Sequence, residues 1–148
     1  MANIASILAE KGSEVLSVSK STTVLEAARM MTKNKCGSLL VTQDTKLLGI
    51  ITERDVLSRV VALELAPTAT PVAAVMSKEI SVCNVQTSVD EARTLMRNLR
   101  IRHLPVVDDA ENIIGLISIG DLNASQLEGQ QQAIHQMHEY IYGQTLEQ

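Results

Sequence analysis

Aromatic residues are nearly absent from this sequence. Its 148 residues include no Phe and no Trp, and the two aromatic side chains are Tyr140 and Tyr142, close to the C-terminus. Proteins that bind single-stranded nucleic acid hold the bases on aromatic side chains, and nucleic-acid binding in general needs a broad basic face. The formal net charge is -4. The sequence therefore argues against a nucleic-acid partner.

Cysteines and long apolar runs are also scarce. Cys36 and Cys83 are the only cysteines, and their spacing excludes a disulfide framework and a thiolate zinc site. We interpret them as small buried side chains in a reducing compartment. No apolar run approaches the ~20 residues that span a membrane, and the N-terminal segment is too short and too acidic for a signal peptide. We expect no membrane association and a cytoplasmic location.

What the sequence does contain is an internal duplication. The segment ISVCNVQTSVDEARTLM, from Ile80, resembles LSVSKSTTVLEAARMM, from Leu16. IRHLPVVDD, from Ile101, corresponds to CGSLLVTQD, from Cys36, at an offset of 65 residues. GLISIGD, from Gly115, then corresponds to GIITERD, at an offset of 66. Two single-residue insertions account for the drift, so the chain is a tandem repeat.

Both copies predict the same order of elements. Capping-box sequences, TVLE at 23–26 and SVDE at 88–91, mark the start of an amphipathic helix. Alternating segments at 15–18 and 80–82 predict a strand before each helix, and two apolar runs around a polar turn predict a hairpin after it. A second helix follows each glycine motif. We predict an α/β (α+β) fold of two β-α-β-β-α repeats related by a pseudo-twofold axis.

The remaining segments flank and join the repeats. We expect an N-terminal helix over 1–14, repeat 1 over 15–65, a linker over 66–78, repeat 2 over 79–124, and a C-terminal helix and tail over 125–148. In the linker, Thr70 as N-cap and Pro71 as the first helical residue predict one short helix. The apolar edges of both terminal helices require a cover, from the repeat core or from a second subunit.

The motifs GIITERD and GLISIGD place a hydroxyl three residues before a carboxylate. On one interpretation each is a capping box, with Thr52 and Ser118 as N-caps and Asp55 and Asp121 closing the box. On the other, the helix start forms an anion site, because its free N–H groups attract phosphate. The glycine would then admit a ligand to the backbone, and the short Asp side chain would face outward. The two interpretations do not exclude each other.

These features together resemble a pair of CBS domains, which are named after cystathionine β-synthase and are called a Bateman module in tandem. The resemblance rests on the doubled glycine motifs, on RHLPVVD before the second, and on the repeat pattern, and it covers roughly Val15 to Leu122. In that family the pair forms two clefts that bind AMP, ADP or ATP, or sometimes NAD or S-adenosylmethionine. The resemblance implies an adenosine nucleotide as regulatory ligand, AMP foremost, and a homodimer.

The resemblance also implies ligand contacts at matching positions. The motif aspartate typically holds the ribose hydroxyls, and the motif hydroxyl contacts phosphate or ribose. Carried over, one cleft would use Thr52 and Asp55, and the other Ser118 and Asp121. Strand backbone near the start of each copy meets the adenine, which implies contacts at Ser17, Ile80 and Val82.

The segment RIRHLP adds positive charge suited to phosphate in an acidic protein. Its candidates are Arg102, His103, Leu104 and Pro105, whereas Arg97 and Arg100 are also explained as complements of a helix C-terminus. Repeat 1 has Lys35, Gly37 and Ser38 at this place and lacks the proline, with Arg54 as a partial replacement for the missing charge. We therefore expect one tight and one weak nucleotide site in each chain.

The sequence gives less support for metal binding or for catalysis. His135, His138 and Glu139 fall on one helix face, and we interpret them as polar surface rather than a metal site. The sequence has no Ser-His-Asp order, HExxH motif, P-loop or GxGxxG motif, so we expect no enzyme and no catalytic cofactor. With no chain left for a catalytic domain, any effector protein would be reached in trans. Two functions remain open: a regulatory module that senses adenylate nucleotides, or a structural dimerisation unit with vestigial, empty clefts.

Overall fold

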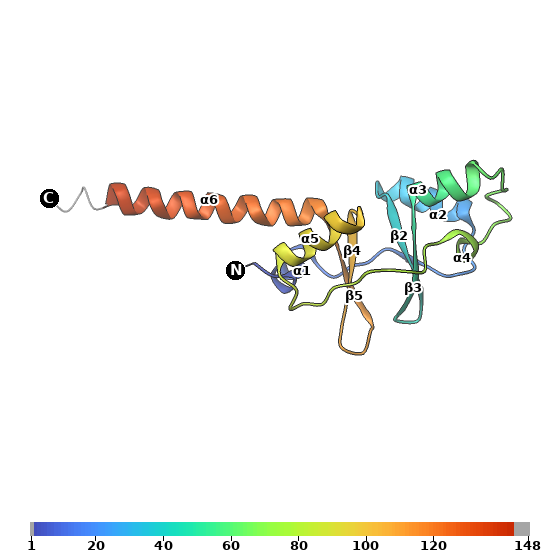
Figure 1. Ribbon diagram of the computed structural model, residues 1–148, viewed down its shortest axis with the longest axis horizontal. Helices are drawn as coiled ribbons and strands as arrows, with labels where there is room; N and C mark the ends of the chain where they lie inside the picture. The colour runs from blue at the N-terminus through green and yellow to red at the C-terminus, as the bar shows by residue number, and fades with distance from the viewer. Residues whose placement is uncertain (1, 144–148) are drawn as a thin grey trace.

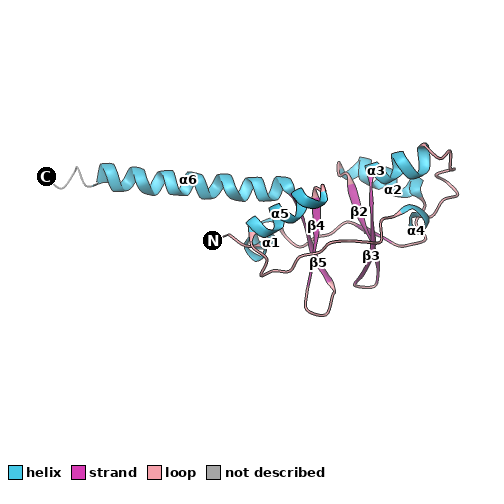
Figure 2. Cartoon of the chain, in the orientation of Figure 1, coloured by secondary structure: helices cyan, strands magenta, loops and turns pink. Residues whose placement is uncertain are grey.

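Each repeat contributes one antiparallel hairpin, and most helices lie toward one end of the two hairpins (Figures 1 and 2). The computed structural model describes residues 2–143. The hairpins are β2 (Ser38–Gln43) with β3 (Lys46–Thr52), and β4 (His103–Val107) with β5 (Ile113–Ser118). A short strand, β1 (Ser17–Val18), pairs parallel to β2, so the first sheet has the order β1-β2-β3.

The first helix of each repeat begins where the capping boxes predict. These helices are α2 (Val24–Asn34) and α5 (Val89–Leu99). The Thr23 hydroxyl accepts from Glu26 N at 3.2 Å, while the Glu26 carboxylate accepts from Thr23 N at 2.9 Å. Ser88 and Glu91 form the same reciprocal pair at 3.1 and 2.9 Å. Local sequence alone therefore determines both helix starts.

The helices that precede the repeats cross over to the opposite half of the chain. α1 (Ile4–Lys11), ahead of repeat 1, buries Ile4 and Ile7 in the core of repeat 2. α4 (Val72–Val75), ahead of repeat 2, buries both of its terminal valines in the core of repeat 1. Each core is completed by a helix from elsewhere in the sequence, so the repeats cannot separate without exposing apolar surface in both.

The second helices differ between the repeats. In repeat 1, α3 (Glu53–Val56) continues into a π-helical turn, η1 (Leu57–Val61). In repeat 2, α6 (Ile119–Gly143) is a single helix of 25 residues that extends past the body (Figure 1). The helix of repeat 2 and the C-terminal helix, predicted as separate elements, are therefore one, because no Gly or Pro interrupts the sequence from Asp121 to Gln126.

The prediction of a first strand in repeat 2 is wrong. Residues 80–82 form no ladder, and the segment pairs with β4 through Cys83 alone. Cys83 N donates to Pro105 O and Val107 N donates to Cys83 O, both at 2.9 Å. The buried side chain is that of Cys83, whereas Val82 is 39% exposed, so the apolar alternation of 80 and 82 does not mark a sheet face.

The predicted start of the linker helix is also displaced. Pro71 is the N-cap of α4 rather than its first residue. The Thr70 hydroxyl donates to Ala66 O at 2.7 Å and is buried. α4 has no side-chain cap hydrogen bond, so Thr70 does not cap it.

The two hairpins also contact each other at their turns. Thr45 Oγ1 donates to Asn112 Oδ1 at 2.7 Å, and Ile113 N donates to Thr45 O at 3.0 Å. Lys46 Nζ adds a hydrogen bond to Ala110 O. These contacts, together with the exchanged helices, fix how the strand ends of the two repeats face each other.

The glycine of each motif lies where another segment crosses its strand. A Cβ on Gly49 would lie 2.5 Å from Met76 Sδ and 2.9 Å from the Ser77 carbonyl oxygen. A Cβ on Gly115 would lie 2.6 Å from Leu8 Cδ2. The chain itself, at the end of α4 and in α1, takes the room that these glycines leave. The glycines do admit a close approach to the backbone, but the segment that approaches is the chain itself rather than a ligand.

The two glycines provide a matched pair of substitutions. Gly49→Ala should lower the free energy of unfolding by about 1–3 kcal/mol, the range for overpacking, because the new methyl group meets backbone. Gly115→Ala should cost less, since the Leu8 side chain can turn away. Urea unfolding midpoints of both variants measure the difference. A larger loss for Gly115→Ala would contradict this packing argument.

Candidate functional site

A cleft of about 890 Å³ lies between the two repeats. One wall is the end of β3 with the start of α3, and the facing wall is the segment that leads from α5 into β4. Residues from 77 to 81 complete the lining. The glycine motif of repeat 1 and the RIRHLP segment of repeat 2 therefore share one cleft, a pairing that the sequence leaves open.

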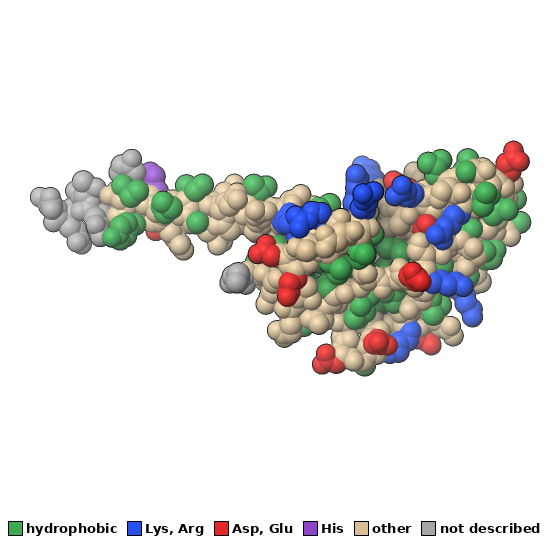
Figure 3. Space-filling model, viewed as in Figure 1, with side chains coloured by type: hydrophobic (Ala, Val, Ile, Leu, Met, Phe, Trp, Pro, Cys, Tyr) green, Lys and Arg blue, Asp and Glu red, His purple; other side chains and the backbone are tan. Residues whose placement is uncertain are grey.

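Basic side chains line part of this cleft. Arg54, Arg100 and Arg102 all lie on its walls, and Figure 3 shows Lys and Arg side chains along the edge between α6 and α3. Burial lowers the pKa of His103 from its ordinary 6.5, and the charge of Lys11 lowers it further. The imidazole is therefore neutral at neutral pH, and the arginines supply the positive charge.

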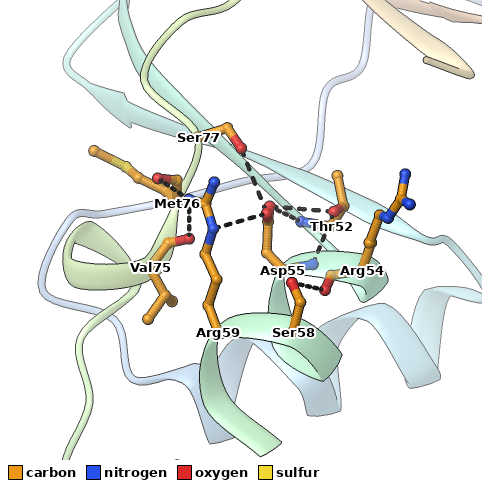
Figure 4. Close-up of polar contacts among 8 residues, drawn as sticks. All are labelled: Thr52, Arg54, Asp55, Ser58, Arg59, Val75, Met76 and Ser77. Atoms are coloured by element: carbon orange, nitrogen blue, oxygen red, sulfur yellow. Dashed lines mark hydrogen bonds and ion pairs between the residues drawn. The ribbon is translucent and has the colours of Figure 1, made fainter. Parts of the chain in front are cut away.

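Thr52 and Asp55 form the predicted capping box on the cleft wall (Figure 4). Thr52 Oγ1 accepts from Asp55 N at 3.2 Å. Asp55 Oδ2 accepts from Thr52 N at 3.0 Å and from the Thr52 hydroxyl at 3.1 Å. The prediction that Asp55 faces outward is wrong: it is 7% exposed, because its side chain is long enough to close the box. The capping interpretation is confirmed.

The second oxygen of Asp55 keeps capacity for a ligand. Ser77 Oγ donates to Asp55 Oδ1 at a long 3.4 Å, and Arg59 Nε lies 3.8 Å from the same oxygen. Arg59 is held instead by two carbonyls, since its Nη1 donates to Val75 O at 3.0 Å and Met76 O at 3.1 Å (Figure 4). A carboxylate oxygen accepts up to two hydrogen bonds, so Oδ1 is able to accept one from a hydroxyl group.

Arg59 and Ser77 were not predicted as site residues, for two different reasons. Arg59 follows Asp55 by four residues, an ion-pair spacing on a helix that the sequence does show. Ser77 has no local signal, because the α4 crossover delivers it to the edge of β3. There its N donates to Ile50 O at 2.9 Å and its O accepts from Ile50 N at 3.0 Å.

The motif of repeat 2 has a charged neighbour. Asp121 Oδ2 accepts from Ser118 N at 2.8 Å, which closes the equivalent box. The same oxygen accepts from Lys11 Nζ at 2.6 Å, and Lys11 also donates to Leu116 O at 2.8 Å. Burial acts to raise the pKa of Asp121, but the hydrogen bonds from Lys11 and Ser118 outweigh it and hold the pKa below the ordinary 3.8. This carboxylate is ionised and paired with an ammonium group.

Lys11 stands where Ser77 stands in the other repeat. Leu116 and Ile50 are equivalent positions of the two motifs. The Ile50 carbonyl accepts from the Ser77 backbone at 2.9 Å, whereas the Leu116 carbonyl accepts from the Lys11 side chain at 2.8 Å. The crossing segment thus brings a neutral serine to one motif and a cation to the other, and the two carboxylates are electrostatically unequal.

The structure brings only some of the predicted site residues into this cleft. Besides the Thr52 box, the candidates that line it are Gly37, Arg54, Ile80, Arg102, His103 and Pro105. Leu104 is buried in the core of repeat 2, because it alternates with its neighbours along β4 and so faces the other side of the sheet. Lys35 lies in a separate hollow between α2 and α3. Ser17 and Val82 are exposed outside the cleft lining.

Ser38 carries a buried hydroxyl without a hydrogen-bond partner, the one such side-chain atom among the described residues. It is 4% exposed and lies opposite Thr52 in the β2–β3 ladder. Opposite residues of a ladder share a face, so its hydroxyl lies on the same sheet face as that of Thr52. Unpaired buried polar groups are rare and costly, but Ser38, a predicted site residue, is not among the residues that line the cleft.

The remaining polar side chains of the described residues form no metal site. Within residues 2–143, no group of three or more His, Cys, Asp and Glu could hold a metal ion, and no described helix is long and apolar enough to cross a membrane. His135 Nε2 lies 3.2 Å from Glu139 Oε1 on the exposed surface of α6. The cleft between the repeats therefore remains the candidate site.

Several known proteins resemble this chain in both sequence and fold. The family model for the CBS domain matches twice, over residues 9–62 and 72–127. CBS domain-containing protein YhcV of Bacillus subtilis is 36% identical over 77% of this chain and 80% of its own length. A CBS-domain protein from Burkholderia ambifaria MC40-6 has a TM-score of 0.81 at 37% identity, over 86% of this chain and 95% of its own.

One similar structure contains a nucleotide. The CBS domain protein PAE2072 from Pyrobaculum aerophilum, complexed with AMP, has a TM-score of 0.72 at 27% identity, over 81% of this chain and 89% of its own. The two family matches fall on the two repeats, in the same order and with the glycine motif inside each. The chain belongs to the CBS-domain family and contains two CBS domains in tandem.

Proposed function

We propose that this chain is a non-enzymatic regulatory module that binds an adenosine nucleotide between its two CBS domains. Tandem CBS domains often bind adenosine ligands, and the similar protein from Pyrobaculum aerophilum was solved with AMP. The observation that carries the proposal is the Asp55 carboxylate. Its Oδ2 is committed to the capping box, while its Oδ1, on the wall of the cleft, has only the long contact of 3.4 Å from Ser77 and the more distant Arg59.

The cleft offers the three kinds of contact that a nucleotide needs. Asp55 Oδ1 would accept hydrogen bonds from the ribose hydroxyls. Arg102 and Arg54 would hold phosphate oxygens, since a guanidinium group presents a planar fork of donors. Aliphatic side chains would enclose the adenine without an aromatic stack, and those on the walls are Ile50, Ile80, Leu99 and Ile101. The volume also lies within the range of about 300–1,000 Å³ typical of small-molecule sites.

Regulation would follow from the position of the cleft between the repeats. A ligand that contacts both walls stabilises the arrangement in which the walls fit it, and so shifts the population of the repeats toward that arrangement. We further propose that this shift changes the affinity of the module for an effector protein in trans. The ligand would thereby report the adenylate status of the cytoplasm. The chain would act as a homodimer. A structural dimerisation unit with empty clefts is the alternative.

A ligand screen separates these two functions. AMP, ADP, ATP, NAD and S-adenosylmethionine are each added to the protein, and the melting temperature is measured. A ligand that binds the folded state raises the melting temperature by mass action, by an amount that grows with its concentration. We expect AMP to give the largest shift. No shift with any of the five would favour the structural alternative.

The carboxylate of repeat 1 should matter more than that of repeat 2. Asp55→Asn keeps an acceptor for the capping box but removes the charge, and should weaken AMP binding by about 1.5–3 kcal/mol, the range for hydrogen bonds to charged groups. Asp121→Asn is the matched control and should change the affinity little, because Lys11 already occupies that carboxylate. Isothermal calorimetry measures both. A greater loss in Asp121→Asn would refute this assignment of the site.

Lys11 should prevent nucleotide binding at the motif of repeat 2. We expect one strong nucleotide site per wild-type chain, and Lys11→Gln should add a second binding event, because Asp121 would lose its ammonium partner. Lys20→Gln makes the same change of charge at an exposed position and should leave the stoichiometry unchanged. The measurement is the number of AMP molecules bound per chain. Two equal sites in the wild type would contradict both the asymmetry and the role of Lys11.

A further inference from the structure

Arg59 does not line the cleft, yet it contacts two segments that build the cleft wall (Figure 4). It is the middle residue of η1, and its side chain is 48% exposed. π-helical turns are rare and frequently occur at functional sites. Since Arg59 is not part of the lining, its role has to come from the groups that its guanidinium holds.

The guanidinium group holds the end of α4. Its Nη1 donates to Val75 O at 3.0 Å and to Met76 O at 3.1 Å. A helix leaves its last carbonyl groups without intrahelical partners, and α4 has only four residues and no side-chain cap hydrogen bond at its start. Arg59 therefore supplies hydrogen bonds that the short helix cannot supply for itself.

The end of α4 determines where one part of the cleft lining lies. Met76 leads directly into Ser77, whose N donates to Ile50 O at 2.9 Å and whose O accepts from Ile50 N at 3.0 Å. Four of the residues from 77 to 81 then line the cleft. On the β3 side, Met76 and Ser77 already lie against Gly49 without room for a further atom. The contact with Gly49 and the bonds from Arg59 together fix the segment that carries this part of the wall.

The same guanidinium group lies beside Asp55. Its Nε is 3.8 Å from Asp55 Oδ1, which is an ion-pair distance rather than a hydrogen bond. Arg59 follows Asp55 by four residues, the spacing that places two side chains on one helix face. One planar group thus joins the carboxylate proposed for the ribose to the carbonyls that precede the wall. A lysine ammonium is a point charge and has no such fork.

Repeat 2 has no arginine at the equivalent position. At the offset of 66 residues, Ser125 corresponds to Arg59. The cation beside Asp121 comes from Lys11 instead, at 2.6 Å. Lys11 bonds its carboxylate directly, whereas Arg59 directs its hydrogen bonds to backbone carbonyls and leaves Asp55 Oδ1 able to accept from a ligand.

We propose that Arg59 is a positioning residue that couples the nucleotide site to α4. A ribose bound at Asp55 and an adenine enclosed by Ile80 contact the two segments that Arg59 joins, so binding stabilises both segments together. The ligand thereby restrains α4, whose valines belong to the core of repeat 1, without touching Arg59. This inference deepens the proposed function and rests on it for the identity of the ligand.

Hydrogen–deuterium exchange of the full-length chain tests the positioning role without a ligand. Arg59→Gln should speed exchange in residues 72–81, because the carbonyls at the end of α4 lose their charged donor and the segment opens more often. Arg59→Lys should recover part of the protection, since an ammonium group still donates to one carbonyl. Exchange as slow in Arg59→Gln as in the wild type would overturn the positioning role.

AMP then tests the coupling. Saturating AMP should slow exchange of residues 52–56 and of residues 72–81 in the wild type. In Arg59→Gln it should still protect residues 52–56 but protect residues 72–81 less. The dissociation constant of AMP should rise about tenfold in this variant, the loss expected for a hydrogen bond to a charged group.

Arg93 provides the matched control. Its Nη1 donates to Asn123 Oδ1 at 2.8 Å and its Nη2 to Leu122 O at 3.2 Å, and it does not line the cleft. Arg93→Gln therefore removes a similar pair of bonds between α5 and α6, and should leave both the AMP affinity and the exchange of residues 72–81 unchanged. Equal effects of the two substitutions would overturn the proposal, because Arg59 would then be a general stabiliser of the fold.

The same measurements keep the two proposals apart. AMP binding to the wild type without protection of residues 72–81 would overturn the coupling and leave the proposed function intact. Wild-type protein that does not bind AMP would overturn the proposed function and the coupling with it. Faster exchange of residues 72–81 in ligand-free Arg59→Gln would still establish that Arg59 holds this part of the wall.

Discussion

The exchange of leading helices between the two repeats is the constraint on which the rest of the structure depends. A unit of about 50 residues buries too little apolar surface to be stable alone. Here the core of repeat 1 takes α4, and the core of repeat 2 takes α1. Because both exchanges hold at once, the two sheets are kept against each other, and the end of β3 faces the start of β4. The cleft between them is a consequence of core packing, and its lining comes from segments that no single repeat contains.

In the proposed function, the capping box and the ligand contact are two uses of one side chain, that of Asp55. The helix start needs an acceptor for the Thr52 amide, and Asp55 Oδ2 provides it. This bond fixes the carboxylate, so that Oδ1 is held on the cleft wall before any ligand arrives. Preorganisation of this kind lowers the entropy lost on binding. It also explains why the motif is consistent with both a structural and a binding role: a residue that is buried and bonded for the sake of the fold would already be in place for the proposed ribose.

The features that could be predicted from sequence are those set within a few residues. The helix starts at Thr23 and Ser88 follow from local hydrogen bonds, and the repeat pattern gives the hairpins. Even the burial of Leu104 could be read from its alternation with the cleft residues of β4. What could not be predicted depends on the exchange. Lys11 reaches Asp121 across 110 residues of sequence, and the shared cleft of the two repeats exists only once α1 and α4 have crossed.

The same reasoning explains how two motifs of the same pattern come to differ in their surroundings. Each box is retained in both repeats because it caps a helix, whatever else it does. The ligand capacity of its carboxylate depends on the segment that crosses the neighbouring strand, which is not part of the motif. Where that segment brings Ser77, Asp55 Oδ1 has only the long contact of 3.4 Å from the Ser77 hydroxyl besides the more distant Arg59, and where it brings Lys11, the ammonium group pairs with Asp121 Oδ2 at 2.6 Å. If the proposed function holds, a change in the crossing segment alone could close one site while the fold and the motif stay intact. On that proposal the motif identifies the repeat, and the residue that crosses beside it decides whether its carboxylate is available to a ligand.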